Sequence, residues 1–384
     1  MDWTIWVEWI VKGFVLCLIL LTGFAYLTLY ERRALARMQV RVGPNRAGYQ
    51  GLLQPIADAV KLIFKEELTP AKVYKLVFVL APVLTVVPSL VLAAVIPLGT
   101  SFTLGGRVIT LYVANLNVGV LYLTSIASIA VYGITLAGWS SNNKYAMLGG
   151  IRASAQMISY ELSLGLCFAI AIVMGNSMNL VDIVNAQKDM WFAVAQPVGA
   201  LIFLIVTLAE VNRAPFDMPE AEQELTAGFH AEYSGMKFAL FFMAEYQKMI
   251  VISMIAATLF FGGYREFWFL KDTIFSVDRY WFLAPIYLLL KVVVWLFFMI
   301  WVRATWPRIR YDRLMAFGWK VLLPLSLVTV FITATGILLN DLYHVTIIGM
   351  PVYILAIPVI SIACAMVAVS LIFRSLRRKS DGRI

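Results

Sequence analysis

The sequence predicts an all-α polytopic membrane protein with about nine transmembrane helices and one interfacial amphipathic helix. Hydrophobic residues fill 61% of its 384 positions and charged residues only 14%, and the mean hydropathy is +0.84. Several apolar runs exceed about 18 residues, enough to cross a hydrocarbon core of about 30 Å. The runs do not alternate as barrel strands do. Lipid offers the backbone no hydrogen-bond partner, so helical spans are expected.

The apolar runs form nine expected spans within a single integral membrane domain, residues 1–384. The first run is too long for a signal-peptide core and lacks a small-residue cleavage site, so we expect it to remain on the mature protein. An additional span and a basic tail are expected within 340–384. The spans are expected at roughly 7–30, 76–97, 115–139, 154–174, 193–211, 237–262, 282–303, 316–339 and 351–373.

The distribution of basic residues predicts the orientation of the chain. Segments after the odd-numbered spans hold 23 of the 31 Lys and Arg residues, against six on the opposite side. Because Lys and Arg accumulate in cytoplasmic loops, we expect the N-terminus outside and the C-terminus inside. The membrane is expected to be the bacterial cytoplasmic (inner) membrane. The acidic loop at 210–236 is then also cytoplasmic.

The long inside segment, residues 31–75, contains an expected amphipathic helix over Gln50 to Glu67. Leu53, Ile56, Val60 and Ile63 recur on one helical face, with charged residues largely on the other. This pattern is typical of a helix that lies in the membrane surface and does not cross it.

The segment 210–234 concentrates acidic residues around one arginine, Arg213. Pro215 and Pro219 are expected to end the fifth span, and Phe216 and Phe229 place aromatic rings among the acids. We interpret it as a polar pocket with aromatic walls for an amphipathic ligand; the alternative is an acidic docking surface for a basic partner. The acids are Glu210, Asp217, Glu220, Glu222, Glu224 and Glu232.

Four charged residues fall within the expected spans: Glu161, Glu245, Lys248 and Lys291. A charge near the centre of a spanning helix costs about 2.5–3.5 kcal/mol on insertion scales, so such residues indicate function. With Glu210 at the inner mouth of the fifth span, they form a hypothetical ladder of ionisable groups descending from the acidic segment. Neighbouring buried carboxylates titrate together, which suits a proton relay.

Structural pairing is the alternative for these charges, and the two interpretations are compatible. Glu245 and Lys248 are three residues apart on one helix and could neutralise each other. Lys291 could neutralise Glu161 from another helix.

The chain is not expected to hold a redox centre or a metal. Its three cysteines, Cys17, Cys167 and Cys364, lie far apart within spans, without the spacing of an iron–sulfur or metal site. The two histidines, His230 and His344, fall on opposite sides of the membrane. Glycine-rich nucleotide motifs are absent from the sequence. Any electrons must therefore come from another subunit.

Five long motifs resemble the quinone-site membrane subunit of respiratory complex I, NADH-quinone oxidoreductase (the H-subunit or subunit-1 family). They cover most of residues 30–325. The motifs are Glu31-Arg32-Arg33 with Gln39 to Arg46; Gln54-Pro55, Asp58, Lys61-Leu62 and Lys65-Glu66; Ser141 to Tyr145 with Arg152, Gln156 and Ser159-Tyr160-Glu161; Glu210 through Ala244-Glu245-Tyr246; and Arg303 with Pro307-Arg308, Arg310-Tyr311-Asp312.

The resemblance implies a chamber in which a quinone head group meets the last iron–sulfur cluster of the peripheral arm. Quinone is the implied substrate, and flavin and iron–sulfur clusters are expected on partner subunits. The partners implied are iron–sulfur subunits, small membrane subunits, antiporter-like subunits and membrane lipid, without nucleic acid. The implied proton path begins at Glu161, Glu210 and Glu245. The implied chamber residues are Glu31, Arg32, Asp58, Phe216, Asp217, Glu220, Glu222, Glu224 and Phe229.

The expected function is therefore a membrane subunit of a proton-translocating NADH:quinone oxidoreductase, a translocase. Its nearest rival is the equivalent subunit of a membrane-bound hydrogenase-type complex. A stand-alone ion transporter is less favoured, because the sequence has no internal repeat and its acids gather on one surface, away from a midplane site.

Overall fold

The structure is a computed structural model that describes residues 3–104, 107–218, 227–267, 275–343, 346–347, 350–351, 356–367 and 370. Within these residues, seven helical stretches are long and apolar enough to cross a membrane, and Pro197–Glu210 and Ala356–Val367 are shorter apolar helices. The chain is therefore an all-α polytopic membrane protein, as its hydropathy predicts. The seven long stretches are Trp6–Met38, Lys75–Val95, Gly119–Ser140, Lys144–Gly175, Gly235–Phe260, Leu283–Thr305 and Tyr311–Leu342.

The described residues form long helices that are joined by short helices, turns and hairpins. The long helices are α1 (Trp3–Met38), α3 (Lys75–Val91), α4 (Gly119–Ser140), α5 (Lys144–Gly175), α8 (Pro197–Glu210), α10 (Gly235–Phe260), α11 (Leu283–Thr305) and α13 (Leu323–Tyr343). Between them lie the short helices and turns η1 (Tyr49–Gly51), α2 (Gln54–Phe64), η2 (Leu92–Val95), α6 (Leu180–Ala186), α7 (Phe192–Ala195), η3 (Gly228–His230), α12 (Tyr311–Phe317) and the π-helical turn η5 (Gly318–Leu322). Two small antiparallel hairpins complete the fold, β1 (Phe102–Leu104) with β2 (Arg107–Ile109) and β3 (Thr346–Ile347) with β4 (Met350–Pro351).

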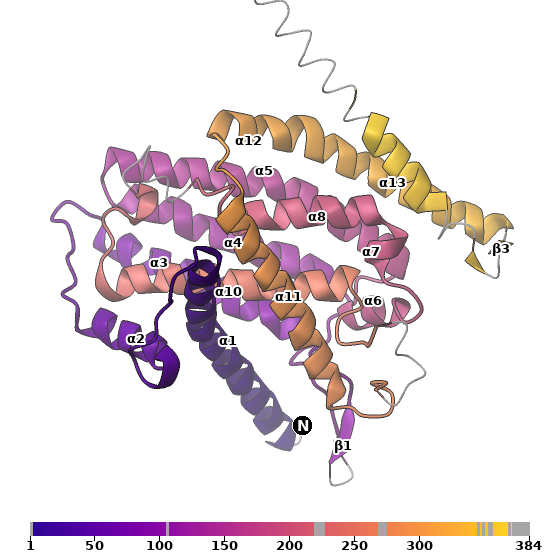
Figure 1. Cartoon of the computed structure of the whole chain (residues 1–384), viewed down its shortest axis with the longest axis horizontal. Coiled ribbons are helices and arrows are strands. Elements are labelled where there is room, and N and C mark those ends of the chain that lie inside the picture. The colour runs from indigo at the N-terminus through magenta and orange to yellow at the C-terminus, as the bar shows by residue number, and fades with distance from the viewer. Residues whose placement is uncertain are drawn as a thin grey trace, which may run out of the picture.

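The bundle centres on α5 and α10. Helices α3, α4, α5, α8 and α10 run side by side, while α1 and α11 cross them obliquely (Figure 1). The helices α12 and α13 lie along the outer face of α5. The apolar core extends through this whole bundle and includes Tyr160, Phe203 and Phe260. Segments that carry charged residues and lie far apart in the sequence therefore come together around α10.

The amphipathic helix predicted near residues 50–67 is present as α2. Its apolar residues Leu53, Ile56, Val60, Ile63 and Phe64 are all exposed in the isolated chain. Pro55, near its N-terminus, is buried, and α2 contacts α1 and α10 at the end of the bundle where the acidic segment lies. An exposed apolar stripe at this position suits a helix that lies in the membrane surface.

Two helices are longer than the hydropathy predicts. Helix α1 continues to Met38, so Glu31 and Arg32 lie on a helix and not in the expected loop. Helix α5 begins at Lys144, ten residues before the expected span, because the Asn143 side chain accepts from the backbone N–H of Tyr145 and caps the helix. Glu161 is therefore in the middle of α5.

The fifth and ninth expected spans are short in the described structure. The fifth divides into α7 and α8, which meet at Gln196 and Pro197. The ninth is described only at Ala356–Val367 and Ser370, and the rest of the expected span and the basic tail lie outside the described residues. Ile357 at the start of this helix packs closely against Gly336 of α13.

Glycine residues let α5 approach two neighbours at backbone distance. A Cβ atom on Gly150 would lie 3.2 Å from the Cα of Gly138 in α4. A Cβ atom on Gly149 would lie only 2.7 Å from the Cα of Gly228, which begins η3. Small residues at helix contacts permit such close packing in membranes. Gly149 thus sets the position of η3 and of the two aromatic residues that follow Gly228.

We expect Gly149→Ala to lower the thermal stability of the assembled protein, because the added methyl group meets backbone and not a flexible side chain. Gly165→Ala on the same helix is the matched control, since its Cβ atom would meet nothing within 4 Å and alanine favours a helix by about 1 kcal/mol over glycine. The measurement is the melting temperature of the purified complex in detergent. Equal melting temperatures for the two variants would contradict this packing.

Candidate charge-transfer site

Arg213 joins a buried carboxylate and a partly buried one, which come from different helices. Its Nη1 lies 3.1 Å from Oε1 of Glu31 on α1, and its Nε pairs with Glu245 on α10. The side chains of Glu31 and Arg213 are 3% and 7% exposed, so both charges are nearly removed from solvent. Arg213 follows α8, where Asn212 takes a left-handed conformation and turns the chain. This arginine therefore connects three parts of the fold.

Further contacts fix the charge state of this cluster. The Arg213 guanidinium lies 4.3 Å from the ring centroid of Tyr246, and the Tyr246 hydroxyl bonds to Glu31. Arg303 of α11 also pairs with Glu31. Burial lowers the pKa of Arg213, but the charges of Glu245 and Glu31 outweigh it and hold this pKa above its usual value. Arg213 remains a cation.

A second ion pair lies one helical turn further along α10. Lys248 Nζ donates to Oε1 of Glu210 at the end of α8, at 2.7 Å. The two side chains are 13% and 4% exposed. Glu161, at the middle of α5, accepts a hydrogen bond from Ser128 of α4. The order of charges from α1 inward is therefore negative, positive, negative, positive, negative, for Glu31, Arg213, Glu245, Lys248 and Glu210.

Two small cavities follow this row of charges. The first, of about 60 Å³, is lined by Glu245 and Lys248 together with Thr85, Ser89 and Asn212. The second, of about 30 Å³, is lined by Glu161, Glu210 and Lys248. A cavity needs roughly 10–15 Å³ for each water molecule, so both have room for water beside polar groups. Lys248 lines both cavities.

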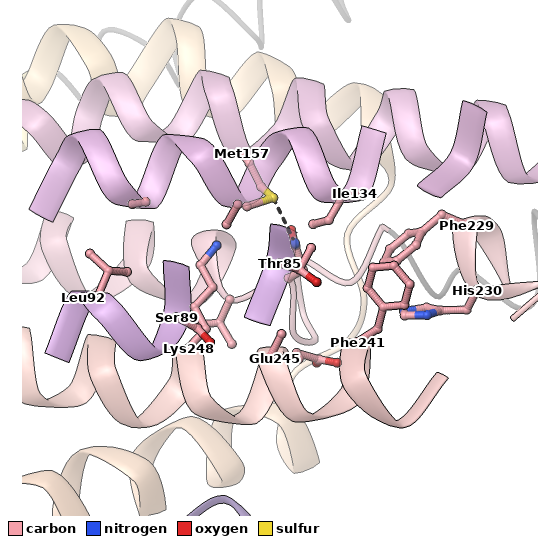
Figure 2. A pocket seen from close by; sticks show the side chains of 15 residues that line it. Thr85, Ser89, Leu92, Ile134, Met157, Phe229, His230, Phe241, Glu245 and Lys248 are labelled. Atoms are coloured by element: carbon pink, nitrogen blue, oxygen red, sulfur yellow. Dashed lines mark hydrogen bonds between the residues drawn. The ribbon is translucent and has the colours of Figure 1, made fainter. Parts of the chain in front are cut away.

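Figure 2 shows the first cavity with Glu245 and Lys248 on one helix. Their charged ends point in different directions, Lys248 toward the helix that carries Met157. At the other end of the cavity, His230 lies against Phe229 and Phe241. Burial lowers the pKa of His230 to about 4. His230 is therefore neutral near pH 7 and adds no charge to the row.

The expected chamber residues do not all lie in one place. Glu31 belongs to the buried cluster, and Arg32 pairs with Asp58 of α2 at 2.6 Å on the surface. Phe216 is 3% exposed and packs against Tyr160 with ring centroids 6.1 Å apart. Asp217 is half-buried, and Phe229 lines the first cavity. Glu220, Glu222 and Glu224 lie outside the described residues.

Both charge pairs considered from the sequence are wrong. Glu245 pairs with Arg213, and Lys248 pairs with Glu210. Lys291 does not reach Glu161, because its Nζ donates to the carbonyls of Gly263 and Arg265 at 2.9 and 2.7 Å. These carbonyls follow α10 at the opposite end from Glu245. Lys291 therefore anchors the loop after α10, and the structure does not join it to the other members of the expected ladder.

Sequence reasoning missed several residues of this cluster as site residues. Arg213 was visible as the single basic residue among six acids, and Arg303 lay in a recognised motif. Tyr246 and Ser128 gave no signal, because only the folded chain brings them to Glu31 and Glu161. Among the described residues, no three His, Cys, Asp or Glu side chains are placed to hold a metal ion.

Comparisons with known proteins agree with this architecture. The family model described as NADH dehydrogenase matches residues 11–334. The chain is 49% identical over 330 residues to an H subunit of the NADH-quinone oxidoreductase of Syntrophobacter fumaroxidans, covering 86% of this chain and 96% of that protein. It is 48% identical over 343 residues to the H subunit of the NADH-quinone oxidoreductase of Thermomicrobium roseum, covering 87% of this chain and 97% of that protein.

The fold and the site define the class of the protein. It is an integral membrane protein whose helical bundle holds a row of ionisable groups of alternating charge. The extent of the match identifies the family: the chain belongs to the NADH dehydrogenase family.

We expect Arg213→Met to destabilise the protein by about 3–5 kcal/mol, because it removes the shared cation of the buried Glu31 and the partly buried Glu245. Arg32→Met is the matched control: its pair with Asp58 is partly exposed, with side chains 46% and 25% accessible, and such pairs contribute about 1 kcal/mol or less. Chemical denaturation of the purified protein in detergent measures both. Similar losses in the two variants would refute the central place of Arg213.

The lowered pKa of His230 predicts an acid-dependent loss of stability. Its ordinary pKa is 6.5 and its folded value about 4, so the unfolded chain binds the proton more readily. Stability should fall as the pH drops from about 6.5 toward 4. In His230→Gln, the difference in melting temperature between pH 7.5 and pH 5 should be smaller than in the unaltered protein. An unchanged difference would show that His230 is not buried in its neutral form.

Proposed function

We propose that this chain is the quinone-site membrane subunit of a proton-translocating NADH-quinone oxidoreductase. It forms part of the quinone chamber and the first part of the path by which quinone reduction moves protons. The observation that carries the proposal is the buried row of alternating charges from Glu31 to Glu210, in a chain whose relatives are named as H subunits of NADH-quinone oxidoreductase. The same names disfavour the hydrogenase-type alternative.

Charge must be able to leave one end of the row and arrive at the other. Glu31 lies beside Arg32, which pairs with Asp58 of α2 at the surface. Glu161 and Glu210 lie at the other end, around the second cavity. A change of charge at the surface alters the field on Arg213, and Arg213 holds Glu245. The chain's own residues thus connect a surface chamber to carboxylates within the membrane.

An apolar groove supports the assignment of an amphipathic substrate. It lies between α1, α10 and α11, has a volume of about 470 Å³, and includes Tyr26 and Tyr30 at the end near Glu31. Its other lining residues are aliphatic or glycine and proline. A quinone has a polar head and a long hydrocarbon tail. The groove suits the tail, and the charged cluster next to it suits the head.

In this proposal the electrons come from iron–sulfur clusters on peripheral-arm subunits, which receive them from flavin. The small membrane and antiporter-like subunits take up the proton path beyond Glu161. The N-terminus is outside, and the C-terminus and the segment after α8 are cytoplasmic. The side on which Lys and Arg accumulate supports this orientation.

We expect Glu161→Gln and Glu245→Gln each to lower NADH:quinone turnover and linked proton transport at least several-fold, because Glu245 belongs to the row and Glu161 lines the second cavity at the end of the row. The measurements are quinone-linked NADH oxidation and proton uptake in membrane vesicles. Oxidation of NADH by an artificial electron acceptor should remain normal and reports assembly. Asp182→Asn is the control, since Asp182 lies on α6, is exposed and accepts a hydrogen bond from Ser177. Full coupled activity in both glutamine variants would overturn the proposal.

A further inference from the structure

Lys248 is the only described cation that borders both interior cavities. Its Nζ holds Glu210 at 2.7 Å on the side of the second cavity. On the side of the first cavity, Glu245 lies three residues earlier on the same helix. Residues three apart on a helix have Cβ atoms about 5–6 Å apart, and a lysine stem has four flexible carbons. The ammonium group can therefore reach either carboxylate.

The groups around Lys248 leave it few other partners. Helix α3 contributes Thr85 and Ser89 to the first cavity, and α4 contributes Ala127 and Thr124 to the two cavities. Ser89 already donates to Gln247, at 2.8 Å. The charged groups that line the two cavities are Glu245 on α10, Glu210 on α8 and Glu161 on α5. A displaced ammonium group can therefore move between these carboxylates.

We propose that Lys248 is a moving cation that exchanges Glu210 for Glu245 and so sets the proton occupancy of Glu210. This rests on the proposed function. When charge in the chamber draws Arg213 toward Glu31, Glu245 loses its cation and Lys248 turns to it. Lys248 leaves with all three of its ammonium protons.

The proton balance follows from burial. Glu210, whose side chain is 4% exposed, is then an anion without a partner in an apolar setting, where the neutral acid is favoured. It takes up one proton that reaches it from the aqueous phase through water in the second cavity, and it becomes a carboxylic acid. When Arg213 returns to Glu245, Lys248 returns to Glu210, and Glu210 releases that proton. One proton is bound and released in each cycle, and no other bond changes.

A moving cation can be distinguished from a fixed structural pair by making both residues of the pair neutral. If Lys248 and Glu210 form only a structural pair, neutral residues at both positions should serve equally well, because no buried charge is then left unpaired. A moving cation is required even when the neutral arrangement is stable. The two roles therefore predict the same stability for a neutral pair but different proton coupling.

The test compares Lys248→Met, Lys248→Arg and the double variant Lys248→Met with Glu210→Gln, all in the assembled complex. We expect Lys248→Met to lower quinone-linked turnover and proton transport about tenfold. The neutral double variant should regain the melting temperature of the unaltered complex but not its proton-to-electron ratio. Lys248→Arg should retain part of the coupling with a shifted pH profile, because it keeps the charge on a more rigid side chain. Lys237→Met is the control, as that lysine lies on the same helix and pairs with Glu67 outside both cavities.

Two results would overturn the inference. One is an unaltered proton-to-electron ratio and pH profile in Lys248→Met; the other is full recovery of both in the neutral double variant, which would make the pair structural. If the double variant does not assemble, an unaltered pH profile in Lys248→Arg would also count against the moving cation. Loss of coupling in Glu245→Gln together with normal coupling in Lys248→Met would reject this inference and leave the proposed function intact.

Discussion

The structure depends on one buried interaction, the pairing of Arg213 with Glu31 and Glu245. Three charged side chains within a membrane bundle are costly unless each is paired and hydrogen-bonded. Arg213 forms ion pairs with two carboxylates at once, with Tyr246 against its plane and Arg303 also paired with Glu31. It therefore ties α1, the segment after α8 and α10 into one unit. Through this contact, a change in the charge of Glu31 alters the electrostatic environment of Glu245.

The surrounding helices explain why the charges remain in a row. Glycines at 138, 149 and 150 let α4, α5 and η3 meet at backbone distance, which brings Ser128 to Glu161 and Phe229 to the first cavity. Helix α8 is short and ends at Glu210, so its terminal carboxylate faces the middle of α10. Close packing leaves room only for small cavities between these groups. The proposed movement of charge along the row therefore needs no opening of the bundle to lipid.

The sequence predicted the fold class and most of the charged residues of the site, but not their partners. Hydropathy identified the long spans, and the depth of Glu161, Glu245 and Lys248 within them marked those residues. Their pairing depends on helix rotation and on the extent of α1 and α5, which hydropathy did not determine. The cap at Asn143 lengthened α5 and moved Glu161 to its middle. Lys291 resembled the others by position but belongs to the loop after α10.

We propose that quinone reduction changes the protonation of buried carboxylates through this row. Infrared difference spectroscopy of the assembled complex, recorded between oxidised and reduced quinone, measures it most directly. The account predicts a change in the carboxylic acid C=O stretching band that shifts in heavy water and is lost in Glu210→Gln. A spectrum without such a band, or one that Glu210→Gln leaves unchanged, would contradict the account.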